Sequence, residues 1–283
     1  MAPKPSHIPE GALEAARAAA IEGGKLALSF FRHGAATSAD VSYKDGGSPV
    51  TEADLAVDRF LKARLMDLAP HFGWLSEETA DDPSRLDRRH VWVVDPIDGT
   101  RSFARGDTDW TIALGLVEDG IAVAGFVYAP VQDVMYEALP GGPALRNGAP
   151  IRASGHGAIA QARIAGPGPI LDAMEAARTP FRRMPRIHSL AYRLVHVADG
   201  SVDGALASGK AHDWDLAAAH AIVTAAGAVI ETPSGVSPTY NRTSTMHEPI
   251  AVAGAALAGD LARLLSAGPI ARAAGHKDAI AGL

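Results

Sequence analysis

The chain contains no cysteine, so neither a disulfide bond nor a thiolate metal site can form. It also lacks a basic run and carries a net charge of −6, which argues against nucleic acid as its main partner. No apolar stretch reaches the roughly 20 residues that a membrane helix needs, and the alanine-rich N-terminus has no signal-peptide core. We therefore expect a cytoplasmic protein that binds neither nucleic acid nor a membrane.

Three common catalytic motifs are missing or incomplete. The eleven histidines form no H-E-x-x-H pair for zinc, and there is no G-x-S-x-G elbow of a serine hydrolase. The stretch Gly204–Ala211 approaches a nucleotide-binding P-loop, but Ala211 stands where magnesium needs a hydroxyl ligand. These departures argue against zinc peptidase, serine hydrolase and nucleoside-triphosphate chemistry.

The composition is that of a folded protein with a sizeable core. Of the 283 residues, 47% are hydrophobic and 20% are charged. This length fits two domains better than one, and a cluster of proline and glycine turns at 140–148 marks a boundary. We predict an N-terminal α+β domain at 1–145 and a C-terminal α/β domain at 146–283.

Apolar periodicity predicts the elements of the first half. Helices are expected at 10–31 and from Thr51 onward, and Asp54 completes a capping-box variant at the second start. A buried strand at 91–94 precedes a meander of three strands at 110–117, 121–128 and 134–138. Loops are expected at 34–50 and 81–85, which are rich in Gly, Asp, Ser and Pro.

The second half alternates between the two kinds of element. Strands are expected at 161–165, 203–207, 229–231 and 250–253, and helices at 170–178, 189–199, 214–226 and 256–265. This alternation favours a mixed sheet flanked by helices.

The most informative stretch follows the strand at 91–94. Asp95 ends the strand, Pro96 has no N–H to continue its ladder, and Asp98 lies three residues after Asp95. Two carboxylates, the free carbonyl of Ile97 and the hydroxyl of Thr100 suit a hard cation and a phosphate. The alternative is a simple Asx turn followed by a capped helix.

Further acids lie at the ends of other elements. Glu77 and Glu78 follow a short apolar run, while Asp213 and Asp215 open the strongest C-terminal helix. Each has a structural alternative, because loops, capping boxes and first helical turns commonly carry acids.

Taken together, these motifs resemble the inositol monophosphatase superfamily. The resemblance rests on Glu77-Glu78, on the run Asp95–Thr100, and on Trp214-Asp215 at the start of a distant helix. It implies a layered α/β/α/β/α sandwich with an antiparallel N-terminal sheet and a mixed C-terminal sheet. It also implies a magnesium-dependent, lithium-sensitive phosphatase, commonly a homodimer, that hydrolyses a small phosphate monoester.

The resemblance further implies roles for single residues. Two or three magnesium ions would be held by Glu77, Asp95, the carbonyl of Ile97, Asp98 and Asp215. Asp54 and Thr100 would orient and deprotonate the attacking water, and Glu78 would support it or a loosely bound ion. The backbone N–H groups of Gly99 and Thr100 would hold the phosphate. The substrate would also meet the second half of the chain at Ser189, Arg193, Ser208 and Asp213.

Departures from the inositol-specific enzymes leave the substrate open. Ser208 stands where those enzymes carry a glutamate that contacts the inositol ring, and Asp213 where they commonly carry cysteine. The spacing of Ser189 and Arg193, together with Tyr240-Asn241, is similar to the nucleotide-phosphatase branch. The alternatives are therefore a 3′(2′),5′-bisphosphate nucleotidase, a histidinol-phosphate phosphatase, or a binding partner of the transcription machinery.

Overall fold

The first sheet has as its second strand a segment that is buried along its whole length. The computed structural model describes residues 7–44 and 47–275, and this sheet has the strand order β3-β4-β5-β6-β7-β8-β9. The strands are β3 Gly73–Ser76, β4 His90–Asp98, β5 Thr111–Glu118, β6 Ile121–Ala129, β7 Val134–Ala138, β8 Leu145–Arg146 and β9 Ala149–Pro150. β3 pairs with β4 in parallel and every other neighbour is antiparallel, so the first sheet is antiparallel except at one edge.

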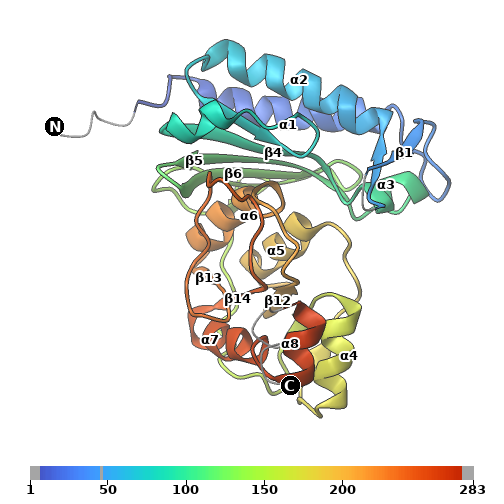
Figure 1. Ribbon diagram of the computed structural model, residues 1–283, viewed down its shortest axis with the longest axis vertical. Coiled ribbons are helices and arrows are strands. Elements are labelled where there is room, and N and C mark those ends of the chain that lie inside the picture. Colours follow the sequence, from blue (N-terminus) through green and yellow to red (C-terminus); the bar gives the residue numbers. More distant parts are fainter. Residues whose placement is uncertain (1–6, 45–46, 276–283) are drawn as a thin grey trace.

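Helices cover both faces of this sheet, as Figure 1 shows. α2 Glu52–Leu68 packs on β4, and α1 Ala12–Leu28 packs on β5, β6 and α2, in one apolar cluster that includes Trp92 and Val94. Val91 and Val93 point the other way, towards α5 Leu190–Ala198 and α6 Asp213–Ala225. Successive residues of a strand face opposite sides, so one apolar strand serves two cores.

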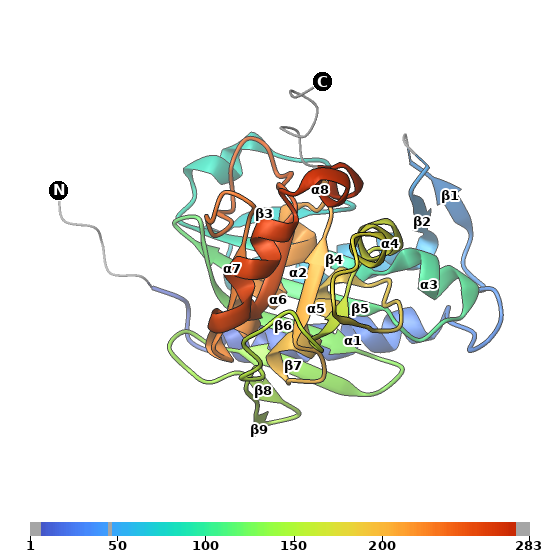
Figure 2. The same cartoon turned by 90° about the horizontal axis from the view of Figure 1, so that it is seen from below.

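The second sheet lies beyond α5 and α6. Its order is β11-β10-β12-β14-β13, with parallel pairing from β11 to β12 and antiparallel pairing from β12 to β13. The strands are β10 Arg163–Ala165, β11 Arg182–Arg183, β12 Gly204–Ala207, β13 Ala228–Glu231 and β14 Ile250–Gly254. α4 Gly168–Ala176, α7 Ala255–Leu264 and α8 Gly268–Ala274 form the outer layer (Figures 1 and 2). The five alternating layers and the mixed second sheet confirm the predicted fold class.

Small residues let α6 approach the first sheet closely. A Cβ on Gly125 of β6 would lie 2.0 Å from the carbonyl oxygen of Ala218, and one on Gly115 of β5 would lie 2.9 Å from the Ala217 Cβ. Only glycine leaves room for a helix backbone at these distances. α6 is thereby held against β5 and β6, and β5 pairs with β4, the strand that carries Asp95.

Several sequence predictions are corrected by the structure. The strand at 91–94 does not end at Asp95, because the β4–β5 pairing shifts register after Asp95 and resumes at Asp98. The segment 34–50 is not all loop: β1 Val41–Tyr43 and β2 Pro49–Thr51 form a small hairpin beside α3 Thr100–Arg105 (Figure 2). Part of 81–85 belongs to the 3₁₀ helix η1 Pro83–Asp87.

Two further points concern the extent of the layers. β8 and β9 extend the first sheet to Pro150, past the boundary expected at 145, and the division into two domains stays a prediction. In the described part of the chain, no helix has both the length and the apolarity to cross a membrane.

Candidate functional site

An irregular end of β4 aims two carboxylates at one point. Asp95 pairs with Ala113 and Asp98 with Thr111, so β4 uses three steps where β5 uses two. Pro96 lies inside this bulge, where its missing N–H leaves no gap in a regular ladder. The Asp95 Oδ1 accepts a hydrogen bond from the Ile97 N–H at 3.1 Å, which is the Asx turn that the sequence offered as the alternative.

Asp98 connects β4 to the start of α5. Its carboxylate accepts the Ser189 hydroxyl at 2.6 Å and the backbone N–H groups of Leu190 at 3.1 Å and Ala191 at 2.6 Å. The partly positive N-terminus of a helix stabilises such a negative group. Ser189, expected at the substrate, is fully buried and supports Asp98 instead of facing solvent.

Asp215 brings the second half of the chain to the same point. It lies in the first turn of α6, where its Oδ2 accepts the His212 N–H at 2.6 Å. Carboxylate oxygens of Asp95, Asp98 and Asp215 all lie within 4.8 Å of one another. We call these three residues the acid cluster.

The charges of the acid cluster are poorly compensated. Burial raises the pKa of Asp95 well above its usual value, and the nearby Glu77, Asp98 and Asp215 raise it further. Burial and Asp98 likewise raise the pKa of Asp215. Burial raises the pKa of Asp98 to about 6 despite its three hydrogen bonds. Buried carboxylates that repel one another are the donor set a divalent cation would neutralise.

Glu77 and Glu78 sit at the end of β3, on the strand beside Asp95. The Glu77 N–H bonds to the Val94 carbonyl at 3.2 Å, which extends the parallel ladder by one residue. Lys44 Nζ contacts Glu77 at 2.9 Å and Glu78 at 2.7 Å. Burial raises the pKa of Glu78 to about 7 even with this lysine beside it.

Asp54 and Thr100 lie in contact, although 46 positions separate them in the sequence; the role that the resemblance implies for them stays a prediction. The Thr100 hydroxyl lies 3.0 Å from both the Asp54 Oδ1 and the Ile97 carbonyl oxygen. The other Asp54 oxygen accepts the N–H and hydroxyl of Thr51, which completes the predicted capping box of α2. Burial raises the pKa of Asp54 to about 6, which favours proton uptake near neutral pH.

The acid cluster, Glu77 and Thr100 line one pocket of about 320 Å³. We call it the acid pocket, and its walls are Ser48, Pro49, Glu77, Asp95, Asp98, Gly99, Thr100, Arg101, Arg186, His188 and Asp215. Gly99 has a φ of 96°, and a Cβ there would lie 2.9 Å from the Asp109 carbonyl oxygen. Glycine is therefore required for the turn that exposes the backbone of Gly99 and Thr100 to the pocket.

A smaller pocket of about 170 Å³ shares Asp215 with the acid pocket. We call it the side pocket, and it is lined by Pro167, Leu190, Arg193, Ala207, Ser208, Lys210, Ala211 and Asp215. Arg193 donates to the carbonyls of Ile187 and Leu206 at 2.8–3.2 Å, so most of its N–H groups are already used. Burial lowers its pKa to about 10. Arg193 therefore reaches the side pocket mainly as a structural residue.

Asp213 is not brought to either pocket. It is fully buried, and its two oxygens bond His247 Nε2 at 2.7 Å and the Asn241 N–H at 2.8 Å. Asn241 in turn exchanges hydrogen bonds with the buried Arg85. Asp213 therefore fastens the start of α6 to the loop after β13, and a substrate contact from it finds no support in this geometry.

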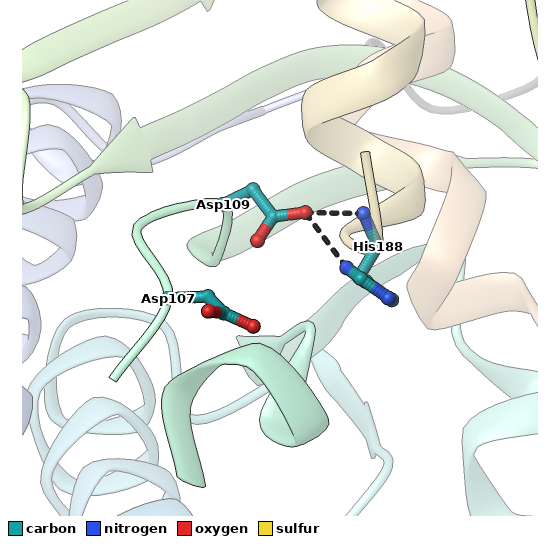
Figure 3. A group of neighbouring side chains, drawn as sticks. All are labelled: Asp107, Asp109 and His188. Carbon is teal, nitrogen blue, oxygen red and sulfur yellow. Dashed lines mark hydrogen bonds and ion pairs between the residues drawn. The ribbon is translucent and has the colours of Figure 1, made fainter. Parts of the chain in front are cut away.

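His188 lines the acid pocket and belongs to a second group of neighbouring side chains, with Asp107 and Asp109, that Figure 3 shows. The Asp109 Oδ2 reaches both the backbone N–H of His188 at 2.5 Å and its ring Nδ1 at 3.1 Å. Asp107 offers a carboxylate oxygen within 4.8 Å of Asp109 and His188, and it accepts two hydrogen bonds from Arg105. Asp109 thus orients the ring of His188 at the acid pocket, and the carboxylate of Asp107 is already paired with Arg105.

Sequence reasoning missed several of these residues for identifiable reasons. Lys44, Arg186 and His188 lie in irregular segments, where no periodicity indicates which side chains face a pocket. Asp58 carried a usable signal, because it is a charged residue one helical turn after Asp54 on the buried face of α2.

The geometry agrees with comparisons to known proteins. The chain matches the inositol monophosphatase family over residues 9–267. It belongs to the inositol monophosphatase family. It is accordingly a phosphatase, within the phosphoric monoester hydrolases.

Relatives with different names lie at similar distances. A probable inositol 1-monophosphatase ImpA of Mycobacterium tuberculosis is 36% identical over 205 residues, which cover 68% of this chain and 74% of that protein. The 3′(2′),5′-bisphosphate nucleotidase CysQ of Shigella flexneri is 33% identical over 209 residues, which cover 69% and 81%. Identity alone therefore separates the two substrate classes poorly.

Solved structures agree on the fold. The extragenic suppressor protein suhB of Bartonella henselae superposes with a TM-score of 0.79 at 25% identity, covering 92% of this chain and all of that one (100%). The IMPase of Thermotoga maritima has the same TM-score of 0.79 at 23% identity, covering 92% and 98%.

Proposed function

We propose that the protein is a magnesium-dependent phosphomonoesterase that hydrolyses inositol monophosphate or a similar small phosphate monoester. The observation that carries this proposal is the acid cluster: three carboxylates within 4.8 Å, those of Asp95 and Asp98 buried and that of Asp215 half-buried, with pKa values raised by burial and mutual repulsion. Such a set is unfavourable without a cation and fits the oxygen ligands that magnesium prefers.

Five groups would hold two or three magnesium ions: Glu77, Asp95, the Ile97 carbonyl, Asp98 and Asp215. Bound magnesium would neutralise charge on the phosphoryl oxygens and lower the pKa of a coordinated water. Lys44 forms an ion pair with the Glu77 carboxylate here, so Glu77 would exchange this lysine for a magnesium ion. No metal ligand comes from a histidine or a cysteine in this proposal.

The chain's own residues would then direct the attack. Asp54, with its pKa near 6, accepts a proton that Thr100 helps to position. Gly99 and Thr100 line the acid pocket, and their N–H groups would orient the phosphate there. Glu78, paired with Lys44, would steady Glu77 or a weakly held ion.

A phosphate-release screen tests this function. Purified protein is incubated with inositol monophosphate, 3′-phosphoadenosine 5′-phosphate and histidinol phosphate, with magnesium and then with chelator. We expect hydrolysis of at least one substrate that requires magnesium. Equal release in chelator would contradict the metal-dependent mechanism.

A bisphosphate nucleotidase is the second candidate, and two cations favour it. Arg186 in the acid pocket and Lys210 in the side pocket make no side-chain hydrogen bond or ion pair with the described residues. Each lines a pocket that Asp215 also lines, so a second phosphate on the substrate would meet a positive charge there. The Shigella flexneri relative carries the corresponding name.

Lys210→Ala separates the two candidates. If the substrate has a second phosphate, this change should raise KM for the bisphosphate about tenfold and leave inositol monophosphate unaffected. Lys25→Ala, on the exposed face of α1, is the matched control for loss of one positive charge. An equal change in KM for both substrates would favour a monophosphatase over a bisphosphate nucleotidase.

Other properties stay proposals drawn from the family resemblance. These are lithium inhibition, assembly as a homodimer and a cytoplasmic location. Light scattering of the purified protein measures the assembly, and lithium titration of the activity measures the inhibition.

A further inference from the structure

Two hydroxyl groups flank the acidic pair at the end of β3. Ser76 precedes Glu77 and Thr79 follows Glu78, and both hydroxyls bond to Asp58 of α2. The Ser76 Oγ lies 2.5 Å from Asp58 Oδ1, and the Thr79 Oγ1 lies 2.5 Å from Asp58 Oδ2. Distances this short are typical of charge-assisted O–H···O⁻ bonds. A single buried side chain therefore spans the turn that carries Glu77.

The direction of these bonds follows from their other partners. The Glu78 N–H donates to the Ser76 Oγ at 3.4 Å, and the Trp74 Nε1–H donates to the Thr79 Oγ1 at 3.3 Å. Because an N–H can only donate, each hydroxyl accepts there and has its one hydrogen left for Asp58. Asp58 must then accept at both oxygens, which a carboxylate does and an amide does not.

Asp58 also stands in a fixed relation to the rest of the site. It follows Asp54 by four residues, so both side chains lie on the same face of α2. Asp54 contacts Thr100 at the end of β4, while Asp58 holds the end of the neighbouring strand β3. One helix thus sets the spacing between the proposed base and the turn of Glu77.

We propose that Asp58 is a positioning residue that holds the 76–79 turn so that Glu77 reaches the acid cluster, and that it thereby sets the affinity for the divalent cation. The proposal rests on the proposed metal site, but it concerns cation binding and makes no claim about the substrate. Partners that orient metal ligands typically contribute tenfold to a hundredfold in metal affinity.

Asp58→Asn is the direct test, because the amide keeps the size and turns one acceptor into a donor. Mn²⁺ alone, without substrate, is titrated into the wild type and the variant and followed by calorimetry. We expect the variant to bind Mn²⁺ about 10- to 100-fold more weakly. The same affinity within threefold, with only a lower melting temperature, would make Asp58 a structural residue and overturn the proposal.

Asp203→Asn is the matched control. Asp203 is another buried carboxylate that accepts a serine hydroxyl, that of Ser154 at 2.7 Å, and it lines neither pocket. This variant should melt at a lower temperature and keep the wild-type affinity for Mn²⁺. A parallel loss of affinity in Asp203→Asn would show that any lost buried carboxylate weakens cation binding, and would overturn a specific role for Asp58.

Thr79→Val removes one arm of the same contact and covers the case in which Asp58→Asn does not fold. It should weaken Mn²⁺ binding by a smaller factor in the same direction, whereas unchanged affinity would count against the proposal. A wild type that binds Mn²⁺ and releases no phosphate would refute the proposed function, and the affinity comparison would still decide the role of Asp58. A wild type that binds no Mn²⁺ would refute both.

Discussion

Asp95 is the most crowded member of the acid cluster. It is buried at the end of β4, and Glu77, Asp98 and Asp215 all raise its pKa after the effect of burial itself. A residue in this environment would gain most from a cation, because one ion relieves several repulsions together. Its removal is therefore the most direct test of metal-assisted catalysis.

Asp95→Asn should lower the rate about a hundredfold, which corresponds to about 2.7 kcal/mol of transition-state stabilisation. The variant keeps the shape of the side chain and the acceptor for the Ile97 N–H, so its melting temperature in chelator should be equal or higher. Phosphate release measured with and without magnesium checks this. Near-normal turnover by the variant in chelator would refute the mechanism.

Asp54→Asn and Thr100→Ala should lower kcat far more than they raise KM, because both act on the water and not on substrate binding. Asp54 has a pKa of about 6, so wild-type activity limited by this group should rise with pH through about 6. A pH series of kcat for the wild type and both variants measures the effect. A change confined to KM would remove Asp54 and Thr100 from the water-activating role.

Arg193→Ala should lower the stability of the fold and should not change the preference between substrates. Arg193 is 7% exposed and its guanidinium bonds two backbone carbonyls, so its loss leaves buried acceptors without a donor. We expect a melting temperature several degrees lower and equal loss of kcat/KM for inositol monophosphate and a nucleotide bisphosphate. A selective loss for the bisphosphate would instead show that Arg193 contacts its second phosphate.

Among the elements, α6 packs closely against two glycines of the first sheet. Gly125 and Gly115 lie under it, and the carbonyl oxygen of Ala218 would be 2.0 Å from a Cβ on Gly125. Because Asp215 is in the first turn of α6, a displaced helix would also displace a member of the acid cluster. The packing of α6 on the sheet therefore affects the position of Asp215 in the acid cluster.

Gly125→Ala should destabilise the protein by about 1–3 kcal/mol, as expected for overpacking against backbone. At roughly 2 °C per kcal/mol for a chain of this length, thermal melting should shift down by a few degrees. Gly155→Ala is the control, because a Cβ there meets nothing within 4 Å. Equal melting temperatures for the two variants would contradict the close approach of α6.

The elements that the sequence predicted well are those with a strong apolar period. α2, α6 and the β5–β7 meander follow from spacing, and the Asp119-Gly120 turn follows from residues that tolerate a positive φ, here 48° and 83°. The β1–β2 hairpin was missed because its strands are only three residues long, and β1 is exposed at all three positions, so neither strand shows an apolar alternation. The continuation of β4 past Pro96 was missed because a bulge depends on pairing with β5, which sequence spacing does not reveal.

At the site, short polar motifs identified residues, and only the fold could assign their orientation. Asp95, Asp98 and Asp215 were expected together and do lie together, although the roles assigned to them stay predictions. Asp213 and Asp215 occupy the same helix turn, yet one faces His247 and the other the acid cluster. Residues two apart on a helix point in different directions, so the residue type in a sequence motif does not tell whether an aspartate faces a metal site or only supports the start of a helix.

For the molecule as a whole, a bound cation would join the two halves of the chain. A cation that binds only the folded state stabilises it by about 2.7 kcal/mol at a hundredfold excess over its dissociation constant. For this length that is a rise in melting temperature of about 5 °C. Calorimetric scans of the wild type should show this rise with magnesium, and Asp215→Ala should lose most of it. An unchanged wild-type transition at saturating magnesium would refute the coupling.

The same stabilisation should depend on pH. Folding raises the pKa of Asp98 to about 6 and those of Asp95 and Asp215 well above their usual value. Without metal, the folded state therefore holds protons more tightly than the unfolded one, and these groups lose their contribution to stability as pH rises from about 4 through 6. Since magnesium and protons compete for these oxygens, the gain on adding magnesium should be larger at pH 7.5 than at pH 5. A gain independent of pH would place the cation elsewhere.

The two-sided first sheet has a consequence for synthesis on the ribosome. Its strands are complete at Pro150, and α1 and α2 already cover one face. The opposite face, with Val91, Val93 and Val127, is covered by helices that begin only at Leu190 and Asp213. A nascent chain of intermediate length therefore presents a bare apolar sheet and resembles an aggregation-prone folding intermediate. A fragment that ends at residue 150 should for this reason accumulate in inclusion bodies or on chaperones, and co-expression of residues 151–283 should return it to the supernatant.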